Sequence, residues 1–167
     1  MADIRQESIR VPYTIRDARP SDGEAMLDLL PRLADFEIPE SRAPEHLWQD
    51  DAALLRRWMS GETDDCLAHV GVDDDGNVVG LTLVRLRPEL LSGEPSAHLE
   101  TIAVAKSVEG QGVAGSLLTA AEREARAHGA LTMTLHVFAV NTRARGMYEK
   151  RGYDGELLRY IKPLTEP

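Results

Sequence analysis

A strand followed by a glycine-rich turn and an apolar helix constrains this fold more than any other feature. Residues 98–104 are predicted to form a strand, and the segment 110–115 holds three glycines before a helix with an apolar face. Glycines let the backbone approach a ligand closely, and a helix N-terminus offers unpaired N–H groups to an anion. The turn therefore predicts a diphosphate site, although a plain tight turn from strand to helix would also use these glycines.

Gly110, Gly112 and Gly115 also match G-x-G-x-x-G, the dinucleotide fingerprint of Rossmann folds. In that fingerprint the first glycine sits tight against its strand, whereas five residues separate Val104 from Gly110 here. The next strand should end on an acidic residue, and Asn141 stands there instead. The context therefore argues against a nicotinamide-binding domain.

The rest of the sequence predicts the order of the strands and helices. A capping box, with Ser21 as N-cap and Glu24 as its partner, predicts where the first helix begins, and Pro31 predicts a kink in it. The order β-α-α-β-β-β-α-β-α-β indicates an α/β (α+β) fold with one mixed sheet. Strands are expected at residues 13–16, 66–72, 78–86, 98–104, 131–138 and 157–161, and helices at 22–36, 45–59, from the glycine-rich turn to 128, and at 141–150.

Length and charge limit the function. The 167 residues suit one domain, expected at 11–167 after a tail at 1–10. A formal net charge of −9 argues against nucleic acid as a partner. The single cysteine, Cys66, excludes an internal disulfide. Without an apolar run of membrane-spanning length or a signal peptide, a cytoplasmic protein with no membrane partner is expected.

A second motif lies in the last predicted helix. Asn141 and Tyr148 are seven residues apart, so they lie near one face of a helix, roughly 10 Å apart along its axis. Taken singly, Asn141 is adequately explained as a helix N-cap and Tyr148 as a core aromatic.

Together, the two motifs resemble the GNAT acetyltransferase superfamily. The resemblance covers about residues 98–153: strand, five-residue gap, glycine-rich turn, helix, strand, then Asn-x-x-Ala-x-x-x-Tyr. It implies a GNAT-type mixed, mostly antiparallel sheet with helices on both faces. The family's cofactor motif, Gln/Arg-x-x-Gly-x-Gly/Ala, corresponds to residues 109–114. Glu109 departs from it and puts a negative charge beside the diphosphate. Because binding there would be largely through backbone amides, the motif is expected to survive if Glu109 points outward.

The activity that the resemblance implies is acetyl-CoA-dependent N-acetylation. The acetyl group would move by direct attack onto a primary amine of a small molecule or a protein, with acetyl-CoA as co-substrate and no metal. Dimers are frequent among such proteins, so a homodimer is a further expectation. A non-catalytic acyl-CoA-binding or sensing domain on the same fold stays open as the alternative.

The resemblance also implies residue roles. Tyr148 would act as general acid, because a tyrosine with a pKa near 10 stays protonated at neutral pH and can donate to a leaving thiolate. Asn141 would hydrogen-bond the cofactor. The pantetheine arm would pair with the backbone of Ile102, Ala103 and Val104, and the diphosphate would bind the amides of Gly110, Gln111, Gly112, Val113, Ala114 and Gly115.

The general base has two candidates, Glu100 on the fourth strand and His136 on the fifth. His136 could equally be a hydrogen-bonded core histidine, and Glu100 an exposed strand residue. Asp35, Glu37 and Glu40 are placed to face a cationic amine between the first two helices and the sheet, unless they form a solvated acidic loop. No metal is expected, because no ligand spacing relates His46, His69, His98 and His128.

Overall fold

A computed structural model describes residues 11–165, so the predicted tail at 1–10 lies outside the described residues. The chain divides into two compact units, Met1–His136 and Val137–Pro167. Each unit is described by itself. None of the described helices is both long and apolar enough to cross a membrane.

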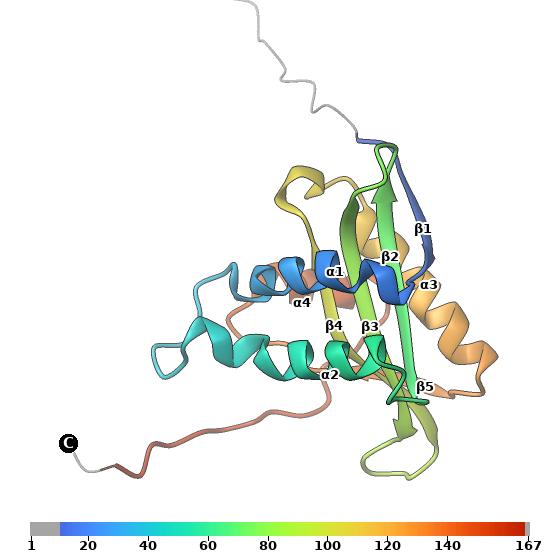
Figure 1. Cartoon of the computed structure of the whole chain (residues 1–167). Coiled ribbons are helices and arrows are strands. Elements are labelled where there is room, and N and C mark those ends of the chain that lie inside the picture. The colour runs from blue at the N-terminus through green and yellow to red at the C-terminus, as the bar shows by residue number, and fades with distance from the viewer. Residues whose placement is uncertain (1–10, 166–167) are drawn as a thin grey trace, which may run out of the picture. The chain divides into compact units, whose positions relative to one another are not determined.

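The first unit is built on one sheet of five strands in the order β1-β2-β3-β4-β5 (Figure 1). Neighbours from β1 to β4 run antiparallel, and only β4 and β5 are parallel. The mixed, mostly antiparallel sheet is therefore confirmed. The strands are β1 (Tyr13–Asp17), β2 (Cys66–Asp73), β3 (Val78–Pro88), β4 (Pro95–Val104) and β5 (Thr132–Leu135).

The hairpin between β2 and β3 forms where the Asp-Gly turn predicts it. Asp73 accepts hydrogen bonds at Oδ1 from the backbone amides of Asp75 (3.0 Å) and Asn77 (2.8 Å). Gly76 takes the left-handed φ of 87° that the turn requires. The side chain of one aspartate thus replaces the backbone bonds that the turn cannot make.

The first two helices begin and end differently from the prediction. α1 (Gly23–Leu29) continues as the 3-10 helix η2 (Leu30–Ala34), which contains Pro31, and α2 (Gln49–Met59) follows the 3-10 helix η3 (Pro44–Leu47). Ser21 is not an N-cap, because it lies inside another 3-10 turn, η1 (Pro20–Asp22). The Asp22 carboxylate holds that turn, accepting from the Arg19 amide at 2.7 Å.

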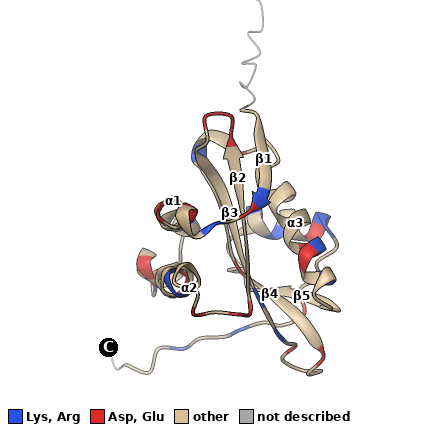
Figure 2. Ribbon diagram, turned by 45° about the vertical axis from the view of Figure 1, so that its right-hand side comes forward, with Lys and Arg blue, Asp and Glu red and all other residues tan. Residues whose placement is uncertain are grey.

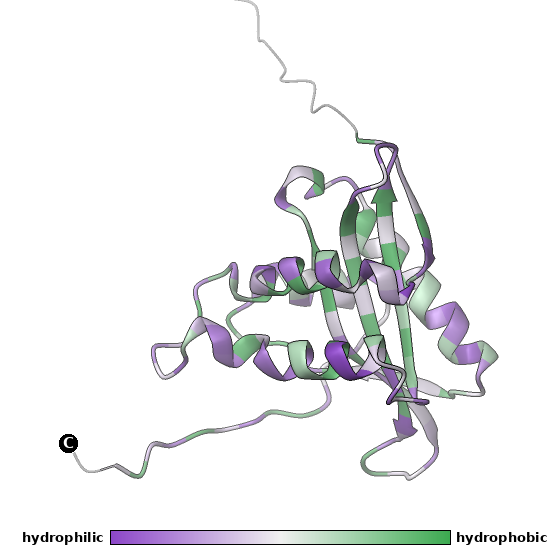
Figure 3. Cartoon of the chain, in the orientation of Figure 1, coloured by the Kyte–Doolittle hydropathy of each residue, from purple (hydrophilic) through white to green (hydrophobic). Residues whose placement is uncertain are grey.

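Helices cover both faces of the sheet (Figure 1). α1, η2 and α2 lie on one face, and α3 (Val113–Ala127) lies on the other. Hydrophobic residues are frequent along the strands (Figure 3). Gly80 on β3 lets α3 approach closely, since a Cβ there would lie 2.9 Å from Cδ1 of Leu117. The core against α1 and α2 contains Met26, Leu30, Ala52, Leu55, Val70, Leu81 and Leu83, and the core against α3 contains Val79, Val108, Val113 and Leu117.

A buried histidine joins β2 to α3. His69 Nε2 lies 2.5 Å from Oε2 of Glu124, and its Nδ1 lies 3.3 Å from the Thr82 hydroxyl. Asp17 is 3.8 Å away, so its carboxylate and that of Glu124 face one ring nitrogen. Because both ring nitrogens already contact protein partners, we interpret the group as a polar link between sheet and helix.

The second unit holds α4 (Thr142–Lys150) and the chain that follows it. The predicted strand at 157–161 is wrong: residues 153–165 belong to no helix or strand. An apolar strand needs a neighbour for its backbone groups, and the described sheet supplies none to this segment. Its side chains are exposed, with 79% for Leu158 and 87% for Tyr160. β5 also ends at Leu135, three residues before the predicted end.

Candidate cofactor and acceptor site

The glycine-rich turn leaves a row of backbone amides available. Gly110 and Gly112 have φ values of 73° and 87°. The first hydrogen bond of α3 runs from the Ser116 amide to Gly112 O, at 3.0 Å. Within residues 11–165, the amides of Gly110 and of 112–115 have no hydrogen-bond partner. The Gln111 amide differs, because it donates to Val108 O at 3.2 Å. Unpaired amides at a helix N-terminus fit a diphosphate.

Replacing Gly112 by Ala tests whether the conformation of this turn matters. A Cβ would meet only the Tyr13 hydroxyl, at 3.5 Å, so the cost comes from the left-handed φ and not from a clash. We expect the free energy of unfolding to fall by about 1–2 kcal/mol, and acetyl-CoA to bind about tenfold more weakly because the amides turn away. Urea unfolding and calorimetric titration measure the two effects.

The control for that change is Gly146→Ala, inside α4, where a Cβ meets nothing within 4 Å and φ is not positive. This substitution should stabilise the protein by about 0.5–1 kcal/mol. Equal acetyl-CoA affinity in Gly112→Ala and in the wild type would show that the turn conformation does not serve the cofactor.

β4 has one edge without a partner strand beyond its midpoint. β5 pairs only with Ser96–Leu99, so Ile102, Ala103 and Val104 have β3 on one side and no strand on the other among the described residues. An unpaired edge can accept an extended ligand as an added strand. One acceptor is already used, because Arg32 Nε donates to Val104 O at 3.0 Å.

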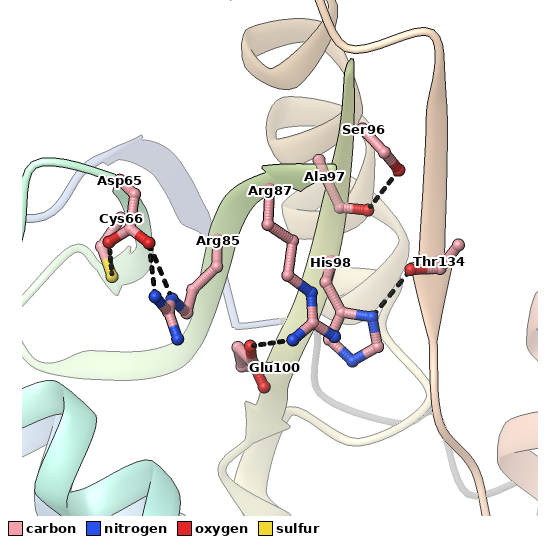
Figure 4. A network of polar contacts seen from close by, with 9 residues as sticks. All are labelled: Asp65, Cys66, Arg85, Arg87, Ser96, Ala97, His98, Glu100 and Thr134. Carbon is pink, nitrogen blue, oxygen red and sulfur yellow. Dashed lines mark hydrogen bonds and ion pairs between the residues drawn. The ribbon is translucent and has the colours of Figure 1, made fainter. Parts of the chain in front are cut away.

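Glu100 lies in a β-bulge at the point where β4 leaves β5. Leu83 faces Thr101 while Val84 faces Leu99, so Glu100 is the extra residue. Its side chain is 21% exposed, and Arg87 Nη1 lies 3.9 Å from its Oε1 (Figure 4). Bulges often redirect a side chain beside an active site. The sequence-predicted base is thus a partly buried carboxylate under the influence of two cations, Arg87 and Arg85.

Asp51, in the first turn of α2, was not predicted as a site residue. Burial raises its pKa to about 7; a partial hydrogen bond from Thr101 opposes the shift, and the charges of Glu100 and Asp50 add to it. Thr101 Oγ1 is itself buried and has no well-formed hydrogen bond among the described residues. A carboxyl group that titrates near neutrality beside Glu100 is typical of a functional site. Asp51 could not be singled out beforehand, because the sequence does not indicate which of the neighbours Asp50 and Asp51 is buried.

Two histidines in contact with each other, His98 and His136, differ in burial. His136 is exposed, which excludes the core interpretation, and its ring centroid lies 4.8 Å from that of His98. His98 is buried, and its Nδ1 lies 2.7 Å from the Thr134 hydroxyl (Figure 4). Burial, with the charges of Arg87 and His136, lowers the pKa of His98 to about 4, so the ring is neutral at pH 7. His98 was missed, although it precedes Glu100 by two residues on one strand.

The predicted acidic residues of the α1–α2 segment lie at the surface. Asp35, Glu37 and Glu40 are exposed, and Asp35 is paired with Arg32. Acidic residues also mark the first turn of α2 (Figure 2). Glu109 does not simply point outward: it is 27% exposed and its Oε1 lies 3.1 Å from Arg32 Nη2. A surface hollow of about 420 Å³ lies between α1 and the β2–β3 turn and includes no predicted site residue.

In the second unit, the Asn141 Oδ1 accepts from the Ala144 amide at 3.2 Å, so the N-cap interpretation is confirmed. The Tyr148 ring contacts that of Tyr153, with centroids 5.7 Å apart. Burial raises the pKa of Tyr148 to about 12, so its hydroxyl stays protonated at neutral pH. None of these observations tests whether Asn141 binds the cofactor or whether Tyr148 acts as the general acid, so both roles stay predictions.

The model of the acetyltransferase (GNAT) family matches residues 30–153, and the chain therefore belongs to that family. One relative is an uncharacterized N-acetyltransferase, YhfO, of Bacillus subtilis. It is 28% identical over 140 residues, which cover 84% of this chain and 89% of YhfO.

Solved structures support the same fold. A putative acetyl transferase from Pyrococcus furiosus has a TM-score of 0.74 at 23% identity, covering 92% of this chain and 100% of that one. The aminoglycoside N-acetyltransferase AAC(6')-Iy in complex with CoA has a TM-score of 0.69 at 21% identity, covering 93% and 97%. AAC(6')-Ih from Acinetobacter baumannii scores 0.69 at 18% identity, covering 93% and 100%.

Proposed function

We propose that the protein is an acetyl-CoA-dependent N-acetyltransferase that acts on a primary amine of a small molecule or a protein, with residues 11–167 as one domain. The observation that carries the proposal is the glycine-rich turn, whose amides at Gly110 and at 112–115 have no partner among the described residues. This turn follows a strand edge that β5 leaves open. Family membership supplies the reaction class.

The residues present fit acetyl-CoA. The amides of the turn would hold its diphosphate, the backbone at 102–104 would bind its pantetheine arm, and Asn141 would add a hydrogen bond. When bound, the cofactor supplies an acetyl group activated as a thioester. The Gln111 side chain supports the turn instead, since its Oε1 accepts from the Val11 amide at 2.7 Å.

The chain's own task is to move two protons. An amine with a pKa of about 10.4 must lose a proton before it attacks, which costs about 4–5 kcal/mol at pH 7. Glu100 is the proposed acceptor of that proton, directly or through water, with His136 as the other candidate. Tyr148 is the proposed donor to the leaving sulfur. Once nitrogen has bonded to the acetyl carbon and the carbon–sulfur bond has broken, the nitrogen would lose its second proton. That proton would restore the one that Tyr148 gives to sulfur, directly or through water, so that the products are an amide, the thiol of CoA and one proton on the base.

The acceptor is proposed to be cationic before it reacts. Glu100 is a partly buried carboxylate, and Asp51 contributes a second carboxyl group beside it. These two carboxyl groups would attract an ammonium group, in competition with Arg87 and Arg85, whose charges also act on Glu100. Two of the structural neighbours are named aminoglycoside N-acetyltransferases, which supports a small-molecule amine.

A panel of amines tests the function: aminoglycosides, polyamines, simple alkylamines and peptides, each with acetyl-CoA, followed by the release of free thiol. We expect turnover with at least one cationic amine, and slower release in Glu100→Gln, which keeps the side-chain shape but cannot take the proton. Binding of acetyl-CoA with no turnover on any amine would favour the acyl-CoA-sensing alternative. Homodimer formation stays a prediction for sedimentation analysis.

A further inference from the structure

Arg32, on η2, contacts the end of β4 and the residue that precedes the glycine-rich turn. Its Nε donates to Val104 O at 3.0 Å, at the end of β4. Its Nη2 lies 3.1 Å from Oε1 of Glu109, the residue that precedes the glycine-rich turn. Its Nη1 pairs with Asp35. One guanidinium thus joins the α1–α2 segment, the open strand edge and the turn.

The charges around the turn explain why a cation is needed there. The unpaired amides of residues 112–115 attract a diphosphate, but the Glu109 carboxylate at the entrance of the turn repels it. Arg32 pairs with Glu109 and offsets its charge. Its side chain is 21% exposed, so the protein does not enclose it completely.

A guanidinium can donate two parallel hydrogen bonds to the oxygens of a phosphate, and it can donate the same pair to a carboxylate. A diphosphate at the turn can therefore compete with Glu109 for Arg32. The bond from Nε to Val104 O occupies an acceptor that the pantetheine arm would otherwise use. Movement of Arg32 toward the diphosphate would add a cation to the phosphates and free that carbonyl together.

We propose that Arg32 is a cofactor-binding residue, held beside the turn by Glu109 and transferred to the diphosphate of acetyl-CoA. This inference rests on the proposed function, because it requires that the turn binds acetyl-CoA. The competing interpretation is a structural clasp, in which Arg32 only fixes η2 to the end of β4.

The test is calorimetric titration with three probes: CoA, 3′-dephospho-CoA, which keeps the diphosphate, and pantetheine, which lacks it. We expect Arg32→Met to weaken CoA and dephospho-CoA binding by about ten- to a hundredfold. Pantetheine should bind equally well or more tightly, because the substitution frees Val104 O. Glu109→Gln should tighten both by about three- to tenfold, because it removes the competing carboxylate. Arg42→Met, which removes a second arginine of the same segment, should leave all affinities within about twofold.

Unchanged or tighter CoA binding by Arg32→Met, with thermal unfolding as in the wild type, would overturn the proposal in favour of the clasp. If that variant does not fold, Glu109→Gln decides: unchanged or weaker CoA binding there also overturns it. A wild-type protein that binds no CoA removes the proposed function as well, whereas wild-type binding with equal affinity in all variants removes only the role of Arg32.

Discussion

Replacing Tyr148 by Phe is expected to lower kcat by about a hundredfold and to leave the affinity for acetyl-CoA within about twofold. The leaving thiolate needs a proton when the carbon–sulfur bond breaks, and a general acid positioned at the sulfur typically contributes that factor. With the pKa of Tyr148 raised to about 12 by burial, the hydroxyl is a donor across the neutral range. The Phe variant keeps the ring and removes only the proton.

Thiol release under steady state gives kcat, and calorimetric titration gives the cofactor affinity. Tyr153→Phe is the matched control, because its ring contacts that of Tyr148 at 5.7 Å and it lies in the same unit. It should retain most of the activity. A wild-type kcat in Tyr148→Phe would remove the residue from the chemistry, and an equal loss in both variants would indicate a packing effect.

Short sequence patterns predicted those parts of the fold that are determined by interactions between residues close together in the chain. The β2–β3 hairpin follows from alternation and an Asp-Gly turn whose bonds all lie within residues 73–77. The end of α3 follows from Gly129, which takes the expected left-handed φ of 87°. The strand expected at 157–161 failed because a strand also needs a neighbour, which no local pattern supplies.

The site was predictable where the backbone forms it and not where distant side chains meet. The glycine-rich turn is contiguous in sequence, so its free amides could be expected. Arg32 reaches a carbonyl 72 residues later, and no spacing rule connects the two. The bulge at Glu100 changes the face of the strand that each side chain occupies, so alternation could not place it.

Replacing Asp51 by Asn should stabilise the protein above neutral pH. The pKa of Asp51 is about 7 in the folded protein against an ordinary 3.8, so the folded state keeps a proton that the unfolded state has lost. The free energy of unfolding therefore falls as pH rises from about 4 to 7, and stays flat above. The full shift corresponds to an upper limit of about 4 kcal/mol. Because the group is partly exposed to solvent, we expect about 2 kcal/mol.

Asn keeps the side-chain shape and does not ionise. Thermal unfolding at pH 4.5 should give nearly equal midpoints for the variant and the wild type. At pH 8 the variant should unfold about 4–8 °C higher, from about 2 kcal/mol at 2–4 °C per kcal/mol for a chain of this length. A carboxyl group kept at such a cost in stability is typical of a site that uses its charge.

The variant Asp50→Asn is the control that distinguishes the effect of burying a carboxyl group from the effect of the helix dipole. Asp50 and Asp51 share the first turn of α2, where a negative charge is favourable, but Asp50 is exposed. Its replacement should lower the free energy of unfolding by about 0.3–1 kcal/mol, with no gain as pH rises. If the two variants show the same pH dependence, the Asp51 carboxyl is solvated in solution and its burial beside Glu100 does not hold. A gain confined to Asp51→Asn, growing between pH 4 and 7, would establish that Asp51 is a desolvated carboxyl group that interacts with Glu100.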